Sequence, residues 1–356
     1  MNETVLLLGA GGSAAANFLD ALRHSDQHYR VIGVDAAPTH LHLSEADERA
    51  LIPRASTDGY LESINKLIEL HNVDFVHPQP DPDVRALSRL RGRVQAATYF
   101  PSPEAIELAA DKLAFAEAMK AKGVAVPEAM TVDGEDHLGD VVEELLKRHE
   151  KLWVRARVGA GARASLPVRS SEQAVAWVRW WVTERGMKAS DFMVSEFLGG
   201  REFAYQSVWQ DGALVAGQAR ERVEYLYGHL TPSGQTSTPS VARTVSIPEV
   251  DELACKAIEA LDAEPRGVYC VDIKESATGR PMVTEINAGR FFTTSNFFAH
   301  AGLNMPDMLV RCALGEHPAP RGSSPLPADL YWIRMVDMPY RLVPGDELDC
   351  WPRADS

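Results

Sequence analysis

The 356-residue sequence has few cysteines, no long apolar run and no excess of basic residues, and each deficit excludes a class of protein. Its four cysteines are widely spaced without a C-x-x-C pair, which argues against a disulfide framework or a cysteine-bound zinc and leads us to expect a cytoplasmic protein. No apolar stretch approaches the roughly 20 residues of a membrane-spanning helix. A formal net charge of −14 argues against nucleic acid and anionic membranes as partners. The expected ligands are therefore small molecules.

Strands and helices alternate over the first hundred residues, as in a parallel α/β sheet. The turn after the first strand carries G-x-G-x-x-A at Gly9, Gly11 and Ala14, and Asp35 ends the second strand. This pattern is typical of NAD binding, but glycine is also common in any strand-to-helix turn, so both interpretations stay open. His77, at the end of a later strand, is either a substrate ligand or a structural residue. The predicted elements are residues 4–8, 13–23, 29–34, 58–71, 73–77 and 94–99.

A second phosphate-binding pattern lies in the middle of the chain. One helix is predicted from Pro103 onward, and a strand over residues 152–157 leads into the loop 159–165, which is rich in small residues. Such loops bind phosphate through backbone N–H groups. Arg155 and Arg157 share a face of the strand, so one or both guanidinium groups are placed to hold a phosphate.

Two further strands, residues 191–198 and 201–209, are separated by the pair Gly199-Gly200. Because a glycine pair interrupts the strand pattern, we interpret it as a hinge between two lobes. Glu196 and Glu202 flank this hinge, where two acids are suited to hold a nucleoside.

Residues 266–290 predict a β-hairpin with a turn over residues 276–280. Side chains alternate along a strand, so Glu285 and Asn287 share a face, and the turn would place Asp272 opposite Glu285. Two facing carboxylates are destabilising unless a positive charge lies between them. The ligands on this face are all oxygens, which favours Mg²⁺, although a solvated polar face remains the simpler alternative.

Together these segments resemble the ATP-grasp superfamily, most closely its carbamoyl-phosphate-synthase-like branch, which includes many carboxylate–amine ligases. The resemblance covers nearly the whole chain. It rests on Asp111-Lys112, on Arg155 before the glycine-rich loop, on the SEFLGGRE stretch at the hinge, and on the Asp272, Glu285 and Asn287 triad followed by Arg290. At residues 287–290 the chain has Asn-Ala-Gly-Arg, which is one residue longer than the Asn-Pro-Arg that is common in the family.

The resemblance implies an α/β (α+β grasp) fold class, with a Rossmann-like N-terminal domain followed by a two-lobed ATP-grasp domain. The expected divisions are residues 1–103 for the first domain, 104–194 and 195–318 for the two lobes, and 319–356 for a linker and tail.

The resemblance also implies ATP and Mg²⁺ as cofactors, with Mn²⁺ as an alternative metal. The implied metal ligands are Asp272, Glu285 and Asn287, and the implied catalytic cations are Arg155 and Arg290. Ser195 competes with Glu196 for the position of the adenine-side acid. The implied ATP-binding residues are Lys112, Arg155, Gly159, Gly161, Ser165, Val194, Glu196, Leu198 and Glu202.

The function that the resemblance implies is an ATP- and Mg²⁺-dependent ligase, which activates a small-molecule carboxylate as an acyl phosphate for attack by an amine. Arg220 and Arg222 share a strand face and either bind the substrate carboxylate or are solvated. The rivals are an NAD-dependent oxidoreductase and a non-catalytic ATP-binding regulator. Expected partners are the carboxylate and amine substrates, without nucleic acid or membrane, and a homodimer stays open.

Overall fold

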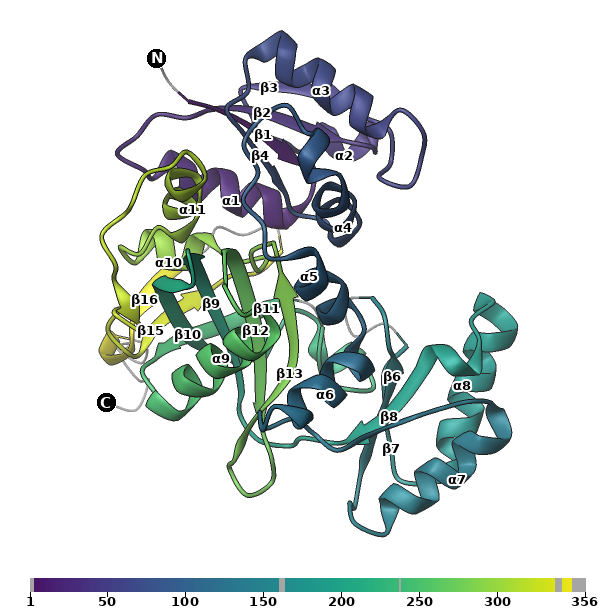
Figure 1. Cartoon of the computed structure of the whole chain (residues 1–356). Coiled ribbons are helices and arrows are strands. Elements are labelled where there is room, and N and C mark those ends of the chain that lie inside the picture. The colour runs from purple at the N-terminus through teal and green to yellow at the C-terminus, as the bar shows by residue number, and fades with distance from the viewer. Residues whose placement is uncertain (1–2, 160–163, 237, 337–340, 348–356) are drawn as a thin grey trace.

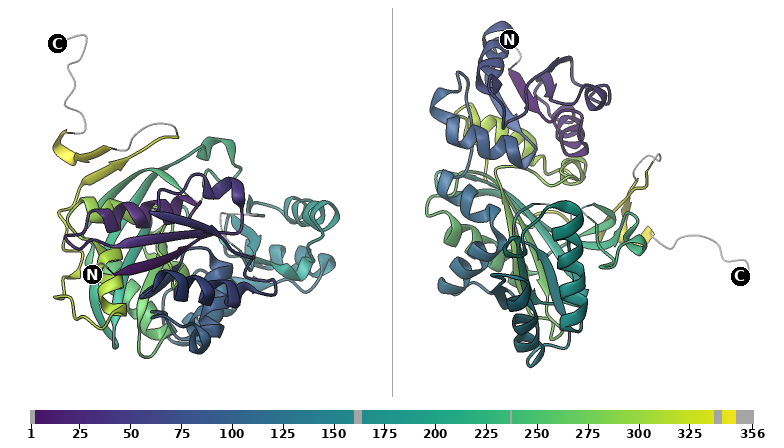
Figure 2. Two further views of the ribbon diagram at one scale, coloured as in Figure 1. Left: turned by 90° about the horizontal axis from the view of Figure 1, so that it is seen from above. Right: turned by 90° about the vertical axis from the view of Figure 1, so that its right-hand side faces the viewer.

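The chain forms three β-sheets in a computed structural model that describes residues 3–159, 164–236, 238–336 and 341–347 (Figure 1). The sheet nearest the N-terminus is parallel, a small antiparallel sheet lies at one side, and a larger sheet forms the body of the molecule (Figure 2). Within the described residues, no helix has the length and apolar character needed to cross a bilayer. The α/β architecture expected from the sequence is confirmed.

The N-terminal sheet has the strand order β3-β2-β1-β4. The inner strand β1 is paired along both edges, and its side chains are buried on both faces, Leu6 and Leu8 in one hydrophobic cluster and Val5 and Leu7 in another. Residues 94–99 were predicted as a strand, but they contribute only an isolated bridge between Phe75 and Ala97. The elements are β1 Thr4–Leu8, α1 Ser13–Arg23, β2 Arg30–Asp35, α2 Pro38–Leu41, β3 Glu48–Leu51, α3 Tyr60–His71, β4 Phe75–Pro78 and α4 Asp81–Leu90.

The single helix predicted after Pro103 is two helices, α5 (Pro103–Ala110) and α6 (Lys112–Ala121). Asp111 separates them with an extended backbone, and its side chain accepts hydrogen bonds from the N–H groups of Leu113 (3.0 Å) and Ala114 (3.2 Å). A carboxylate in this position caps the new helix by satisfying N–H groups that have no partner within it. The break therefore fixes where Lys112, the first residue of α6, projects.

The small sheet has the strand order β5-β8-β6-β7, and helices α7 and α8 pack against it (Figure 1). It has a hydrophobic core of its own, built from the inward faces of these strands and helices. The predicted strand over residues 191–198 is β8. The elements are β5 Ala129–Thr131, α7 Glu135–Leu146, β6 Leu152–Ala156, β7 Leu166–Val168, α8 Ser171–Arg185 and β8 Phe192–Glu196.

The large sheet has the order β13-β12-β9-β10-β11-β15-β16, with β14 paired to β10. The expectation of a linker and tail after residue 318 is wrong for the described part, because this segment supplies β14, β15 and β16, and Trp332 is buried there. The elements are β9 Glu202–Gln210, β10 Ala213–Tyr225, β11 Pro239–Val245, α9 Pro248–Leu261, β12 Gly267–Glu275, β13 Pro281–Ala288, α10 Asn296–His300, α11 Met305–Ala313, β14 Gly322–Ser323, β15 Leu330–Ile333 and β16 Arg341–Pro344.

The N-terminal sheet and the large sheet share their hydrophobic core. One continuous cluster of buried side chains includes Leu7 and Phe18 from the first unit and Phe291 and Leu309 from the second. His77 lies within it, stacked on Phe18 with ring centroids 4.4 Å apart. Burial lowers the pKa of His77 to about 3, so its imidazole is neutral. Of the two interpretations of His77, the structure supports the structural one.

Candidate active site

A cavity of about 260 Å³ lies between the small and large sheets. Six cationic side chains line it against four acidic ones, which leaves a formal charge of +2 in a protein whose total is −14. Such a local excess favours an anionic ligand. The charged lining residues are Lys112, Arg155, Arg220, Arg222, Lys274, Arg290, Glu196, Glu202, Asp272 and Glu285.

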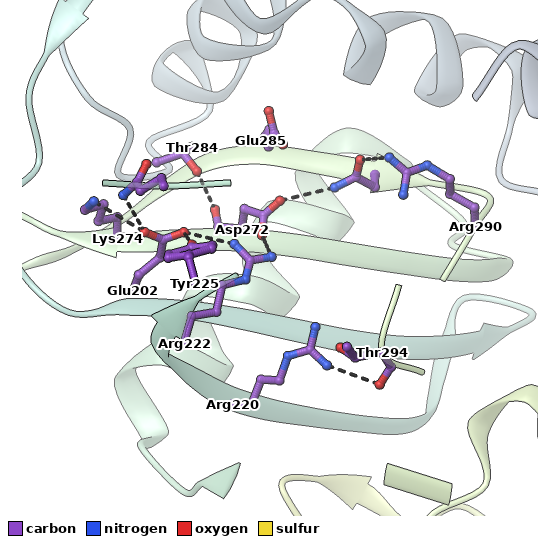
Figure 3. A network of polar contacts seen from close by, with 12 residues as sticks. Glu202, Arg220, Arg222, Tyr225, Asp272, Lys274, Thr284, Glu285, Arg290 and Thr294 are labelled. Carbon is purple, nitrogen blue, oxygen red and sulfur yellow. Dashed lines mark hydrogen bonds and ion pairs between the residues drawn. The ribbon is translucent and has the colours of Figure 1, made fainter. Parts of the chain in front are cut away.

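The β12–β13 hairpin places Asp272 directly opposite Glu285, as predicted from the sequence. Close to the turn, however, the strands pair one residue away from the predicted register, since Ile273 lies opposite Val283. A bulge at Thr284 restores the predicted register at Asp272 and Glu285. Thr284 donates from its hydroxyl to the Asp272 carbonyl at 3.1 Å. The bulge thus lets the turn coexist with a pair of facing carboxylates (Figure 3).

Glu285 interacts with two cations from other elements. Its Oε2 lies 3.3 Å from Lys112 Nζ and 4.0 Å from Arg155 Nη1. Burial acts to raise the pKa of Glu285, but the positive charges of Lys112 and Arg155 outweigh it and hold the pKa below its usual range. The carboxylate is therefore ionised at neutral pH.

Asp272 interacts with a different cation. Its Oδ1 accepts from Arg222 at 2.5 Å, and its Oδ2 accepts from Asn287 Nδ2 at 3.2 Å. Burial raises the pKa of Asp272, and the negative charge of Glu285 adds to this against the opposing effect of Arg222. The two facing carboxylates thus differ in their affinity for a proton, because each meets its own set of charges.

Glu202, expected beside the ribose, lies in the cavity wall at the start of β9. Arg222 donates to its Oε1 at 3.0 Å, Gln235 donates to Oε2 at 2.7 Å, and Tyr225 also donates to Oε1 (Figure 3). Lys274 Nζ lies 3.3 Å from Oε2. Burial acts to raise the pKa of Glu202, but Arg222 and Lys274 outweigh it, so this acid is held ionised.

Neither Arg220 nor Arg222 is solvated, so one of the two interpretations left open by the sequence is excluded, and binding of a substrate carboxylate stays a prediction. Arg220 is 1% exposed and lies over the rings of Phe292 (5.1 Å) and Phe298 (5.7 Å). Burial lowers the pKa of Arg220 to about 9, so it remains charged at neutral pH. Its Nη1 donates to the Thr294 carbonyl at 3.3 Å, and its buried Nε finds no hydrogen-bond partner in the described part of the chain. This guanidinium retains donors for an anion.

One part of the cavity is apolar and lies where the chain passes from β8 to β9. Trp153 and Phe197 line it, with ring centroids 5.7 Å apart, and Leu198 adds an aliphatic side chain. Ser195 and Glu196 both line the cavity, so geometry does not separate these two candidates. The lining also includes Pro127 and Ala156.

Val194 was predicted to contact a ligand, but its side chain is fully buried in the core of the small sheet. It points there because alternate residues of β8 face opposite sides, and this strand pairs with both β5 and β6. A ligand contact with the Val194 side chain is therefore excluded, and a contact with its backbone stays a prediction.

The small-residue loop is described only at its ends. Gly159 and Ser165 line the cavity, and the Gly159 carbonyl accepts from Lys112 Nζ at 2.5 Å. Gly161 lies outside the described residues. Arg157 does not line this cavity, because its Nη2 donates to the Asp111 carboxylate at 2.7 Å. Of Arg155 on β6 and Arg157 just after that strand, Arg155 alone lines the cavity.

Arg290 reaches the cavity despite the extra residue in Asn-Ala-Gly-Arg. Its Nη2 donates to Asn287 Oδ1 at 2.5 Å, and its Nε donates to Asp81 at the start of α4. Gly289 has φ +92°, and a Cβ at this position would lie 2.8 Å from Val84 Cγ1. The added glycine therefore makes the close turn that brings Arg290 back to the site.

The Gly9–Gly12 turn is filled by the chain itself. A Cβ on Gly9 would lie 2.4 Å from the Pro80 ring, and one on Gly11 would lie 2.4 Å from the His40 backbone. Asp35 accepts hydrogen bonds from the N–H groups of Gly11 (3.1 Å) and Ala37 (2.9 Å). Local packing thus accounts for the glycines and the acid that suggested NAD binding.

Several lining residues were missed by the sequence interpretation, among them Lys274, Tyr225 and Gln235. Lys274 lies two residues after Asp272 on the same strand, so the alternation of side chains was a signal that could have found it. Tyr225 and Gln235 gave no comparable signal, since they reach Glu202 only through the folding of β10 and the segment after it.

No family model and no curated protein sequence matches the chain. Solved structures do match. The biotin carboxylase domain of Hydrogenobacter thermophilus 2-oxoglutarate carboxylase, a dimer solved with MgADP, ADP and bicarbonate, gives a TM-score of 0.70 at 18% identity, covering 93% of this chain and 74% of that one.

Two further enzymes are similar over 93% of this chain, each with a TM-score of 0.69 at 14% identity. They are N5-carboxyaminoimidazole synthetase from Staphylococcus aureus, solved with ADP (82% of that chain), and L-amino acid ligase from Bacillus licheniformis (79% of that chain). All three are ATP-grasp enzymes. The chain thus has the ATP-grasp fold, with a Rossmann-like sheet before it.

Proposed function

We propose that this protein is an ATP- and Mg²⁺-dependent carboxylate–amine ligase, in which a small-molecule carboxylate is activated as an acyl phosphate and then attacked by an amine. The observation that carries the proposal is the Asp272–Glu285 pair, set among Lys112, Arg155 and Arg222 in one cavity. Two of the three structurally similar enzymes were solved with MgADP or ADP, which supports an adenine nucleotide here.

The donor set fits a magnesium ion. Asp272 and Glu285 offer carboxylate oxygens, and Asn287 lies beside them with an amide oxygen that is bound by Arg290, so this amide would join the metal ligands only in exchange for that contact. Since the described residues that line the cavity include no histidine or cysteine, the set favours a hard cation. When bound, Mg²⁺ would neutralise phosphate charge and orient the terminal phosphate. Mn²⁺ prefers the same oxygen ligands and remains an alternative metal.

Contacts with the nucleotide are assigned to side chains that line the cavity. We assign adenine to the apolar part of the cavity, around Trp153, Phe197 and Leu198. Lys112 and Arg155, from two different elements, are assigned to the phosphates. Phosphoryl transfer depends on alignment and charge neutralisation more than on a protein nucleophile, so no nucleophilic side chain is required.

The substrate carboxylate is assigned to Arg220, because this buried guanidinium retains donors and lines the cavity. Arg290 is assigned to the charge that develops during transfer, since it lies at the end of the triad through its contact with Asn287. The divisions 1–103 and 104–194 are proposed as the N-terminal domain and the first ATP-grasp lobe. The second lobe, expected over 195–318, is proposed to continue through β16 because β14, β15 and β16 belong to the large sheet. A homodimer is proposed as an alternative to a monomer, and the expected cytoplasmic location also stays a proposal.

The test is phosphate release from ATP with Mg²⁺ and pools of carboxylates and amines. Release that requires both pools, and that is lost in Glu285→Ala but kept in Glu259→Ala, would support the ligase. Glu259 is an exposed acid on α9 and serves as the matched control. ATP binding without turnover by any pool would favour the non-catalytic regulator, and binding of NAD instead of ATP would favour the oxidoreductase.

A further inference from the structure

Outside the cavity, two histidines and an aspartate meet where the N-terminal sheet docks on the large one. Asp20 lies on α1, His24 directly follows that helix, and His300 ends α10. One ligand atom from each residue lies within 4.8 Å of the others. Helices α1 and α10 lie side by side at this junction (Figure 1).

The spacing of the cluster is close to that of a metal site. His300 Nε2 lies 2.8 Å from Asp20 Oδ2, and His24 Nδ1 lies 3.9 Å from Asp20 Oδ1. The two imidazoles meet edge to face, with centroids 3.8 Å apart. Zinc bonds of about 2.0 to 2.1 Å in a tetrahedral arrangement put the ligand atoms roughly 3.3 Å apart. Small side-chain rotations would therefore bring all three ligands onto one ion.

The carboxylate is already held by a neighbouring side chain. Asn296 Nδ2 donates to Asp20 Oδ2 at 2.7 Å, and Asn304 Nδ2 donates to the Ala21 carbonyl at 2.6 Å. Hydrogen bonds of this kind orient metal ligands and are a regular part of metal sites. The first is made between α1 and α10, and the second fixes α1 against the start of α11.

We infer that Asp20, His24 and His300 bind a transition-metal cation of the zinc type, which links α1 to α10. Imidazole ligands favour Zn²⁺ over Mg²⁺, so this site is chemically distinct from the oxygen-only triad of the cavity. The side chains of Asp20 and His24 are 33% and 47% exposed, so water can take the fourth position.

The site has a structural consequence because of its place in the chain. The segment just before α10 contains Phe292 and Thr293, which line the cavity, and Thr294, whose carbonyl binds Arg220. An ion that ties α10 to α1 would restrain this wall of the cavity. It would also stabilise the docking of the N-terminal unit by mass action, since the unfolded chain lacks the assembled site.

The experiment uses the full-length protein, stripped of metal by a chelator and kept in millimolar Mg²⁺ so that the oxygen triad is occupied. Zn²⁺ affinity is measured by competition with a chromophoric chelator, and Co²⁺ is added separately to record its visible absorption. We expect one tight site per chain and the spectrum of a tetrahedral cobalt ion. In His24→Ala the affinity should fall by at least about tenfold, because the loss of a residue that only supports a metal ligand already costs roughly 10- to 100-fold.

Asp20→Asn provides a second variant, because asparagine keeps the shape and can still accept a hydrogen bond from His300. It should weaken Zn²⁺ binding while unfolding at the same denaturant concentration as the wild type in the absence of metal. His42→Ala is the control, since His42 is an exposed histidine outside the cluster, and its affinity should be unchanged. Equal Zn²⁺ affinity in wild type and His24→Ala, or the lack of a tight site in wild type, would overturn the inference.

Discussion

The capping of α6 by Asp111 can be tested separately from its ion pair with Arg157. In Asp111→Ala, the helix loses the acceptor of two backbone N–H groups, which costs about 1 kcal/mol at a helix N-terminus. The partly exposed pair with Arg157 adds about 0.5 kcal/mol. Asp111→Asn keeps the cap, because asparagine caps as well as aspartate, and loses only the smaller part.

The measurement is urea unfolding followed by circular dichroism, with phosphate release as a second readout. We expect Asp111→Ala to lower the free energy of unfolding by about 1.5 kcal/mol, and Asp111→Asn by about 0.5 kcal/mol. Asp111→Ala should also reduce ATP turnover, since Lys112 begins the helix that the cap fixes. If the two variants unfold at the same urea concentration, the capping explanation is refuted.

The contribution of Asp111 to the free energy of unfolding should depend on pH in a definite direction. Burial acts to raise the pKa of Asp111, but its hydrogen bond with Arg157 and those from the backbone outweigh it and lower the pKa from 3.8. A carboxyl whose pKa is lowered by folding stabilises the protein above its unfolded-state pKa and loses this effect as the pH falls through its folded-state pKa. The stability difference between wild type and Asp111→Asn should therefore be constant above about pH 5 and shrink below pH 3.8.

Three further predictions concern the cavity and its turn. Glu285→Ala should abolish ATP turnover while leaving the circular dichroism spectrum unchanged, and near-normal turnover at modest Mg²⁺ would show that the metal assignment is wrong. ATP with Mg²⁺, and not NAD, should raise the melting temperature, because a ligand that binds only the folded state stabilises it. A shift with NAD alone would favour the oxidoreductase over the ATP-dependent ligase. Gly289→Ala should lower the melting temperature more than Gly279→Ala, since both glycines have positive φ but an added Cβ meets Val84 at 2.8 Å only at Gly289; equal shifts would mean that the contact with Val84 relaxes freely.

The elements predicted best are those whose signals are local. The strand Thr4–Leu8 and the helix Ser13–Arg23 were predicted with their exact bounds, because an apolar run, a glycine turn and an alanine-rich helix follow one another without ambiguity. The helix after Pro103 was predicted without its break, although Asp111 is a good capping residue. A capping residue inside a continuous helical pattern does not show whether the chain uses it.

The candidate site was predicted in part. The facing of Asp272 and Glu285 follows from the pattern of one hairpin, but the bulge at Thr284 that restores it could not be predicted from the pattern. The partners of Arg222 lie on β9 and β12, 20 and 50 residues away in the sequence, so its two ion pairs depend on sheet order. Val194 was assigned from the motif alone, which did not show that the strand turns the side chain of this residue into the core.

The hydrophobic core that the N-terminal sheet shares with the large sheet limits where the chain can be cut into separately folding fragments. A fragment that starts at residue 104 would keep every cationic and acidic residue of the cavity lining, but it would expose Phe291 and Leu309, which are fully buried in the whole chain. Arg290 would also lose its carboxylate partner, Asp81. Contiguous apolar surface of this kind drives association. The N-terminal unit thus completes the hydrophobic core of the large sheet, and a fragment made without it should aggregate rather than fold.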